Sequence, residues 1–245
     1  MKLKIGIILL LVLISAYLGT KIFQKPTVQT KIEQIKQEIV PTKPIHLDST
    51  GFPNRYLIEA PFVEQAPKKD WSQPWQDACE EAALLTPYYY YSSITPSSDQ
   101  IVQDLTKIFD YENSQGWSHD VNLEQMQQIA QDLWGLSSEI IQNPTVDQIK
   151  ERITNNQPIV VPANGKTLFK ENKHFKAGGP WYHNLVIIGF DDDQKKFIVH
   201  DVGTQFGAKF KYSYSLLLKS IHDFPSTLNK EDIDQGDQKV LVLLK

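Results

Sequence analysis

The chain contains a single cysteine, Cys79, and this residue carries the most informative chemistry. One cysteine cannot form an intrachain disulfide or a cysteine-based zinc site. We expect a helix to begin here, with Asp77 as its N-cap and Glu80 completing a capping box. At a helix start the macrodipole stabilises a thiolate, the nucleophilic form of cysteine, while Glu80 and Glu81 oppose it. An inert buried cysteine is the alternative.

His183 is the best candidate partner for the thiol. It opens the strongest predicted strand, residues 182–190, just before the apolar run of residues 185–188. A histidinium beside the thiol would favour the thiolate. A histidine packed in the core is the other interpretation. The remaining histidines lie in weaker contexts, and no two have the i, i+4 spacing of a helical metal site, so we expect no metal.

Asp201 can orient that imidazole, as the acid of a catalytic triad does. It follows the predicted strand 196–200, which pairs with strand 182–190 through a polar turn. A hairpin folded about Asp193 brings Asp201 near Leu185, on the same face as His183. A register shift of one residue would put the two on opposite faces. An ordinary turn role for Asp201 is the alternative.

Two glutamines upstream of Cys79 are candidates for stabilising an oxyanion. Acyl transfer to a thiol needs donors for the developing negative charge, such as a side-chain amide and the backbone N–H of the nucleophile. Gln65 and Gln76 both qualify, and both could equally be surface residues. The residues alone leave this choice open.

Taken together, these segments resemble a known family. Residues 61–67 (PFVEQAP), Trp71 and residues 77–82 (DACEEA) resemble the N-terminal signature of bacterial domains related to the double-glycine leader, or bacteriocin-processing, cysteine peptidases. These belong to the papain-like superfamily. Residues 182–191 are similar to the histidine strand of the family and residues 200–204 (HDVGT) to its Asp-Pro-Gly-Thr element. The resemblance covers roughly residues 56–224.

The resemblance implies a papain-like fold in which Cys79 on a helix faces His183 and Asp201 on a sheet. It also implies that Gln65, rather than Gln76, holds the oxyanion. The chain departs from the leader peptidases at two positions. Glu80 stands where they carry glycine after the catalytic cysteine, and Val202 replaces the proline.

The function we expect is that of a cysteine peptidase-like thiol hydrolase, which cleaves peptide or amide bonds through an acyl-enzyme. The alternative is a catalytically inactive peptide-binding module on the same fold. In either case a peptide or protein is the partner and no cofactor is needed. The predicted substrate-binding residues are Trp71, Trp75, Glu80 and Trp181, although core packing is the alternative for the tryptophans.

Hydrophobic periodicity predicts an α+β fold, with helices first and an antiparallel sheet second. Pro87 should end or kink the first helix, and residues 166–179 form a long loop that could act as a lid. The predicted helices span residues 77–86, 98–111, 122–133, 146–154 and 215–222, and the predicted strands span residues 158–161, 182–190, 196–200, 210–214 and 240–244.

The N-terminus is typical of an exported protein. Lys2 and Lys4 precede an apolar stretch over residues 5–18, so residues 1–24 are interpreted as a membrane anchor or a cleaved signal peptide. We favour the anchor, with the body outside the cytoplasm. Residues 25–50 form a Pro- and Gln-containing linker and residues 51–245 the peptidase-like domain. The net charge of −4 argues against nucleic acid as a partner, and we expect a monomer.

Overall fold

The computed structural model describes residues 51–245, which belong to the second of two compact units, His46–Lys245. The expected anchor (residues 1–24) and linker (residues 25–50) lie outside the described residues. Within residues 51–245, no helix combines the length and the apolar character that crossing a membrane requires.

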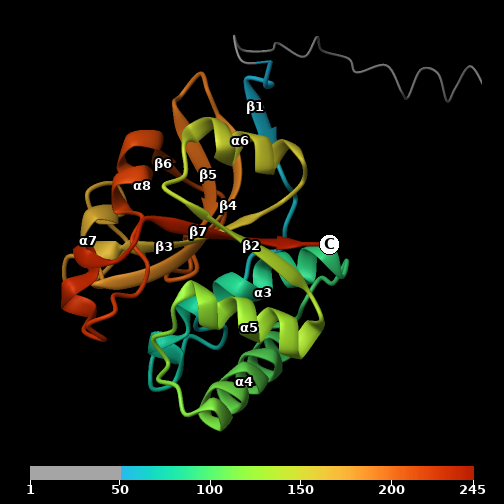
Figure 1. Ribbon diagram of the computed structural model, residues 1–245, viewed down its shortest axis with the longest axis vertical. Coiled ribbons are helices and arrows are strands. Elements are labelled where there is room, and N and C mark those ends of the chain that lie inside the picture. The colour runs from blue at the N-terminus through green and yellow to red at the C-terminus, as the bar shows by residue number, and fades with distance from the viewer. Residues whose placement is uncertain (1–50) are drawn as a thin grey trace, which may run out of the picture. The chain divides into compact units, whose positions relative to one another are not determined.

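Helices dominate the first half of the described chain and strands the second, which confirms the predicted α+β class. Figure 1 shows α3, α4 and α5 grouped on one side and the sheet on the other. The helices are α3 (Cys79–Tyr91), α4 (Ser98–Gln115), α5 (Leu123–Trp134), α6 (Val146–Thr154), α7 (Gly165–Leu168) and α8 (Tyr214–Ser220), with 3₁₀ turns η1 (Trp75–Asp77) and η2 (Lys230–Gln235).

The sheet is antiparallel throughout, in the order β2-β7-β3-β4-β5-β6, and β1 pairs with the far end of β4. β4 pairs with β3, β5 and β1, and every one of its residues is buried. The strands are β1 (Arg55–Leu57), β2 (Ser137–Gln142), β3 (Ile159–Asn164), β4 (Tyr182–Asp191), β5 (Lys196–His200), β6 (Phe210–Ser213) and β7 (Lys239–Leu244).

Helix boundaries follow local capping chemistry at most positions. Asn122 caps α5 and Thr145 caps α6, each in a reciprocal capping box with the glutamine three residues later. Gly116 and Gly135 end α4 and α5 in the left-handed conformation that glycine adopts without strain.

The start of α3 differs from the sequence-based expectation. Its N-cap is Ala78, which has no side-chain cap, and Cys79 is the first helical residue rather than the second. The Asp77 carboxylate belongs to η1 and accepts a hydrogen bond from Gln73 Nε2 at 2.6 Å, so it is engaged elsewhere. The predicted capping box between Asp77 and Glu80 was therefore wrong.

A kink or an end was expected at Pro87, and the end was wrong, because α3 continues to Tyr91. Leu84, Leu85 and Tyr89 are fully buried, and α3 packs against β3, β4, α4 and α5. This packing on all sides outweighs the backbone hydrogen bond that a proline forfeits. The tyrosines after Pro87 are thus helical.

The β4–β5 hairpin has the register that places Asp201 beside His183. Val186 pairs with His200, so continuation of the ladder sets Asp201 opposite Leu185, as predicted. A β-bulge between Ile187 and Gly189 separates this register from the one nearer the turn. Without the bulge, every residue from Val199 onward would shift by one position and face the other way.

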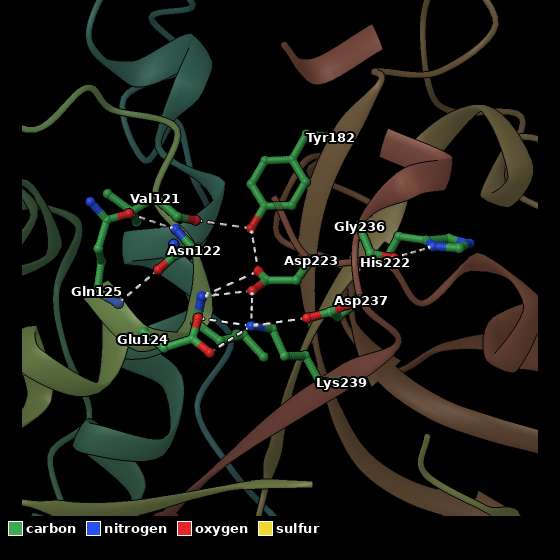
Figure 2. Close-up of polar contacts among 11 residues, drawn as sticks. Val121, Asn122, Glu124, Gln125, Tyr182, His222, Asp223, Gly236, Asp237 and Lys239 are labelled. Atoms are coloured by element: carbon green, nitrogen blue, oxygen red, sulfur yellow. Dashed lines mark hydrogen bonds and ion pairs between the residues drawn. The ribbon is translucent and has the colours of Figure 1, made fainter. Parts of the chain in front are cut away.

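A buried polar cluster joins the sheet to the start of α5, next to the strand that carries His183. Figure 2 shows Asp223 between Tyr182 and Lys239. Lys239 Nζ lies 3.0 Å from Asp223 and 2.6 Å from Glu124, and both Asp223 oxygens accept from Leu123 N. Tyr182 O–H donates to Val121 O at 2.9 Å. Burial raises the pKa of Asp223, although the Lys239 charge and the backbone donors oppose this.

We predict that Asp223→Ala lowers the free energy of unfolding by about 3–5 kcal/mol, because it leaves the ammonium of Lys239 buried with one partner fewer. The exposed ion pair between Lys209 and Glu59 provides the control. Glu59→Ala should cost no more than about 1 kcal/mol. Urea unfolding followed by circular dichroism measures both changes. Equal losses of unfolding free energy in the two variants would show that the buried cluster does not stabilise the fold more than an exposed ion pair does.

Candidate functional site

A cavity of about 740 Å³ brings the sequence-predicted residues together. Cys79 lines it from the start of α3, His183 from the start of β4, and Gln65 and Gln76 from the segment before α3. The walls also contain Trp71, Trp181, His174, Phe175, Gly203 and Phe206. Asp201 is completely buried behind His183.

Cys79 owes its position to the packing of α3 on β4, the strand that carries His183. The thiol is buried, with a residue exposure of 6%, yet it borders the cavity. Because Cys79 is the first residue of α3, its backbone N–H has no partner inside the helix. A nucleophile and an oxyanion donor are therefore available on one residue.

The thiol donates its hydrogen bond to Glu80 Oε2, with 3.0 Å between sulfur and oxygen. Burial raises the pKa of Cys79 well above its ordinary value, and the negative charges of Glu80 and Glu81 raise it further. The backbone N–H of Asn184 acts in the opposite direction. In this arrangement the sulfur is protonated, and the helix macrodipole does not prevail.

His183 and Asp201 form a buried pair, with 2.8 Å between Nε2 and Oδ1. This contact leaves Nδ1 as the ring nitrogen available to another partner. Phe175 packs edge-on against the imidazole, with ring centroids 5.1 Å apart. Gly203 passes so close that a Cβ there would lie 2.6 Å from His183 Cε1. The ring is thus fixed in position and orientation.

Two residues that the sequence did not single out hold Asp201 in place. Its Oδ2 accepts from Asn172 Nδ2 at 2.9 Å and from Tyr212 O–H at 2.6 Å. Burial alone would raise the pKa of Asp201, but the charge and hydrogen bonds of His183, with those of Tyr212 and Asn172, lower it. Asn172 lies in the segment expected to be a lid, which here supports the site.

Gln65 faces the cavity but already uses both hydrogens of its amide. Nε2 donates to Trp75 O at 3.1 Å and to Gln76 O at 2.7 Å, so it braces η1 directly before Cys79. To bind an oxyanion it would exchange one of these bonds for the substrate oxygen. Gln76 is exposed and also lines the cavity. Both oxyanion candidates are therefore brought to the site.

The four predicted substrate-binding residues separate into two groups. Trp71 and Trp181 line the cavity and are 46% and 39% exposed. Trp75 instead packs against Phe109, at 5.7 Å between ring centroids, and Glu80 is buried behind Cys79. Neither lines the cavity. Phe206, which is 57% exposed, does line it and was missed because a lone phenylalanine in a loop gives no pattern.

Three buried glutamates lie behind the thiol, Glu80 and Glu81 on α3 and Glu112 on α4. Glu81 has no hydrogen-bond partner for either oxygen, and Glu80 and Glu112 each have one unpartnered oxygen. Burial raises the pKa of all three, and their mutual charges add to the effect at Glu80 and Glu81. His119, at 3.5 Å, is the cation-forming group nearest Glu112. Within residues 51–245, no cluster of histidine, cysteine and acidic residues is arranged to hold a metal ion.

We predict that Glu81→Gln stabilises the fold more at pH 8 than at pH 5. The folded pKa of Glu81 is raised, so the unfolded chain releases its proton first and stability falls as the pH rises. Removal of this group should add about 1 kcal/mol or more at pH 8, the free energy of one pKa unit. Denaturant unfolding at both pH values measures the gain. Glu151→Gln, on the exposed face of α6, is the control, and an equal response of both variants would contradict the prediction.

Comparison with known proteins places this geometry in a family. The sequence model of the Peptidase_C39 like family matches residues 57–224. Among solved structures, the chain is similar to a candidate C39-like peptidase from Bacillus anthracis, at 14% sequence identity and a TM-score of 0.47. That alignment covers 78% of this chain and 98% of the other. No curated protein matches the chain.

The family match extends from β1 to the segment after α8 and so includes the cysteine helix, the histidine strand and Asp201. It confirms the resemblance found in the sequence, and the helix-plus-antiparallel-sheet architecture agrees with it. The chain belongs to the C39-like family of cysteine peptidase domains.

Proposed function

We propose that this protein is a thiol hydrolase that cleaves peptide or amide bonds through Cys79, His183 and Asp201. The buried pair of His183 and Asp201 carries the proposal, because its free imidazole edge belongs to the same cavity as the only cysteine. An ordinary core histidine needs no fully buried carboxylate that three separate donors hold in place.

The proposed reaction begins when the Cys79 proton passes to Nδ1 of His183, leaving a thiolate beside an imidazolium. The sulfur attacks the carbonyl carbon of the substrate. His183 then returns the proton to the leaving amine, and an acyl-enzyme remains. Water or a second amine then attacks the carbonyl carbon of this thioester, which releases the acyl product and regenerates the Cys79 thiol. Asp201 orients the ring and stabilises its charge throughout.

The oxyanion of the tetrahedral intermediate is assigned to the Cys79 backbone N–H and the Gln65 amide, with Gln76 as the alternative. Donors of this kind act where charge develops, in a site that excludes water. The free N–H at the first position of α3 supports the first part of the assignment. The proximity of Gln65 to η1 supports the second.

The rim of the cavity favours a peptide that carries bulky apolar side chains. Trp71, Trp181 and Phe206 are among the few large hydrophobic side chains that stand exposed on residues 51–245, and all three line the cavity. Exposed aromatic side chains that gather in one cleft provide area for a ligand to bury.

We propose that the protein acts outside the cytoplasm as a monomer, tethered by residues 1–24, as the N-terminal sequence pattern suggests.

The second candidate is a peptide-binding module that keeps the fold without turnover. The hydrogen bond from the Cys79 thiol to Glu80 favours it, because a sulfur held by a carboxylate is not a nucleophile. Both candidates share the cleft and the aromatic rim. They differ in whether Cys79 ever becomes acylated.

We predict that the full-length protein hydrolyses fluorogenic peptides with bulky apolar residues and that Cys79→Ala and His183→Ala each reduce kcat/KM by about a thousandfold or more. His222→Ala is the matched control, since His222 bonds Gly236 O and lies away from the cavity lining. It should retain most of the activity. Binding of the same peptides without turnover or an acyl-enzyme mass would instead establish the binding module.

We predict that Gln65→Ala lowers kcat about 10²–10³-fold with a smaller change in KM, the signature of a lost oxyanion donor. Gln76→Ala should change kcat only slightly, because the backbone N–H and Gln65 remain. Steady-state kinetics on both variants decide the assignment. The reverse result would transfer the oxyanion role to Gln76.

A further inference from the structure

The thiol of Cys79 and the carboxyl of Glu80 form a buried contact that the proposed reaction does not use. Cys79 is 6% exposed and Glu80 is 1% exposed, so neither group exchanges its partner freely with water. The sulfur is the donor, with 3.0 Å to Oε2. The other oxygen of Glu80, Oε1, has no hydrogen-bond partner. The Cys79 thiol is therefore the side-chain donor to this buried carboxyl.

Acidic groups from several elements surround Glu80. Glu81 is its neighbour on α3, Glu112 faces it from α4, and Asp120 faces it from the segment before α5. Tyr182 lies near it on β4. Lys230 on η2 is the cation that interacts with it, and that ammonium already lies 3.6 Å from Asp120 and 3.9 Å from Asp77. His119 faces Glu112. Acids outnumber cations around this carboxyl.

Two positions of the sulfur therefore exclude one another. A thiol that donates to Glu80 must keep its proton, and a thiolate 3 Å from a carboxylate would be repelled. A thiolate paired with His183 must instead have passed its proton to Nδ1, since Nε2 is held by Asp201. The S–H bond breaks, the N–H bond forms, and no other proton is needed.

We propose that Glu80 is a positioning residue that holds the Cys79 thiol in a protonated resting state, and that the sulfur leaves Glu80 for His183 when the site becomes active. The part that concerns His183 rests on the proposed function, whereas the hold of Glu80 on the thiol does not. Glu80, which stands where leader peptidases carry glycine, thus acts on the Cys79 thiol through a buried hydrogen bond and does not line the cavity.

The test uses the single cysteine of the chain, so that alkylation by iodoacetamide reports Cys79 alone. In full-length Glu80→Gln, which keeps the size of the side chain without its charge, the midpoint of the alkylation rate against pH should fall by about one unit. The rate at pH 7 should then rise about tenfold, because the thiolate is the reactive form. Intact-mass spectrometry follows the labelling.

Glu81→Gln is the matched control, because it removes a buried carboxylate next in the chain that does not bond the sulfur. Its shift should be clearly smaller than that of Glu80→Gln. An unchanged midpoint in Glu80→Gln, or an equal shift in both variants, would overturn the proposal. Circular dichroism verifies that each variant is folded.

A measurement on the unaltered protein keeps the proposal testable if Glu80→Gln does not fold. The Raman S–H stretch of Cys79 should lie below that of a thiol without a strong acceptor, and an unshifted band would overturn the contact. Neither readout requires turnover. Shifted alkylation without peptide hydrolysis would refute the proposed activity and leave the role of Glu80 intact, whereas hydrolysis with an unshifted midpoint would do the opposite.

Discussion

The site depends on one buried interaction, the contact between Asp201 and the imidazole of His183. An ionised carboxylate with no exposure is stable only when its charge and lone pairs are satisfied, and here His183, Asn172 and Tyr212 supply the donors. These donors come from β4, the segment after α7, and β6. The two carboxylate oxygens of Asp201 therefore connect β4, β6 and the segment after α7 through hydrogen bonds. The bulge in β4 is the constraint that brings Asp201 to the correct face.

The two sides of the cavity differ in electrostatics. On the sheet side, donors lower the pKa of Asp201 and favour its charge. On the helix side, burial raises the pKa of Glu80, Glu81 and Glu112, and neighbouring acids raise the pKa of Glu80 and Glu81 further. Environments that move pKa values apart in this way separate the roles of chemically similar groups. Cys79 lies at the boundary, because its thiol bonds Glu80 on the helix side and it lines the same cavity as His183 on the sheet side.

The sequence allowed much of the fold to be predicted, because the signals were local. Val146–Thr154 and Lys196–His200 matched their predicted bounds, and α5 begins one residue after its predicted start at Asn122, which caps it. The start of α3 was not, because the Asp77 carboxylate bonds Gln73 instead. β2 was missed because it is an edge strand in which only Ile141 is buried, so it shows no alternation. The supporting roles of Asn172 and Tyr212 depend on tertiary contacts that no local pattern encodes.

The candidate residues were found from their order along the chain, but the state of the thiol was not. Sequence reasoning weighed the helix macrodipole against Glu80 and Glu81, and a macrodipole is worth at most about 2 kcal/mol. Burial removes the solvent that would screen both acids, so their charges outweigh the dipole. The helix start alone therefore cannot generate the thiolate. In the proposed reaction the imidazole of His183 provides the compensating charge, once the thiol has given up its hydrogen bond to Glu80.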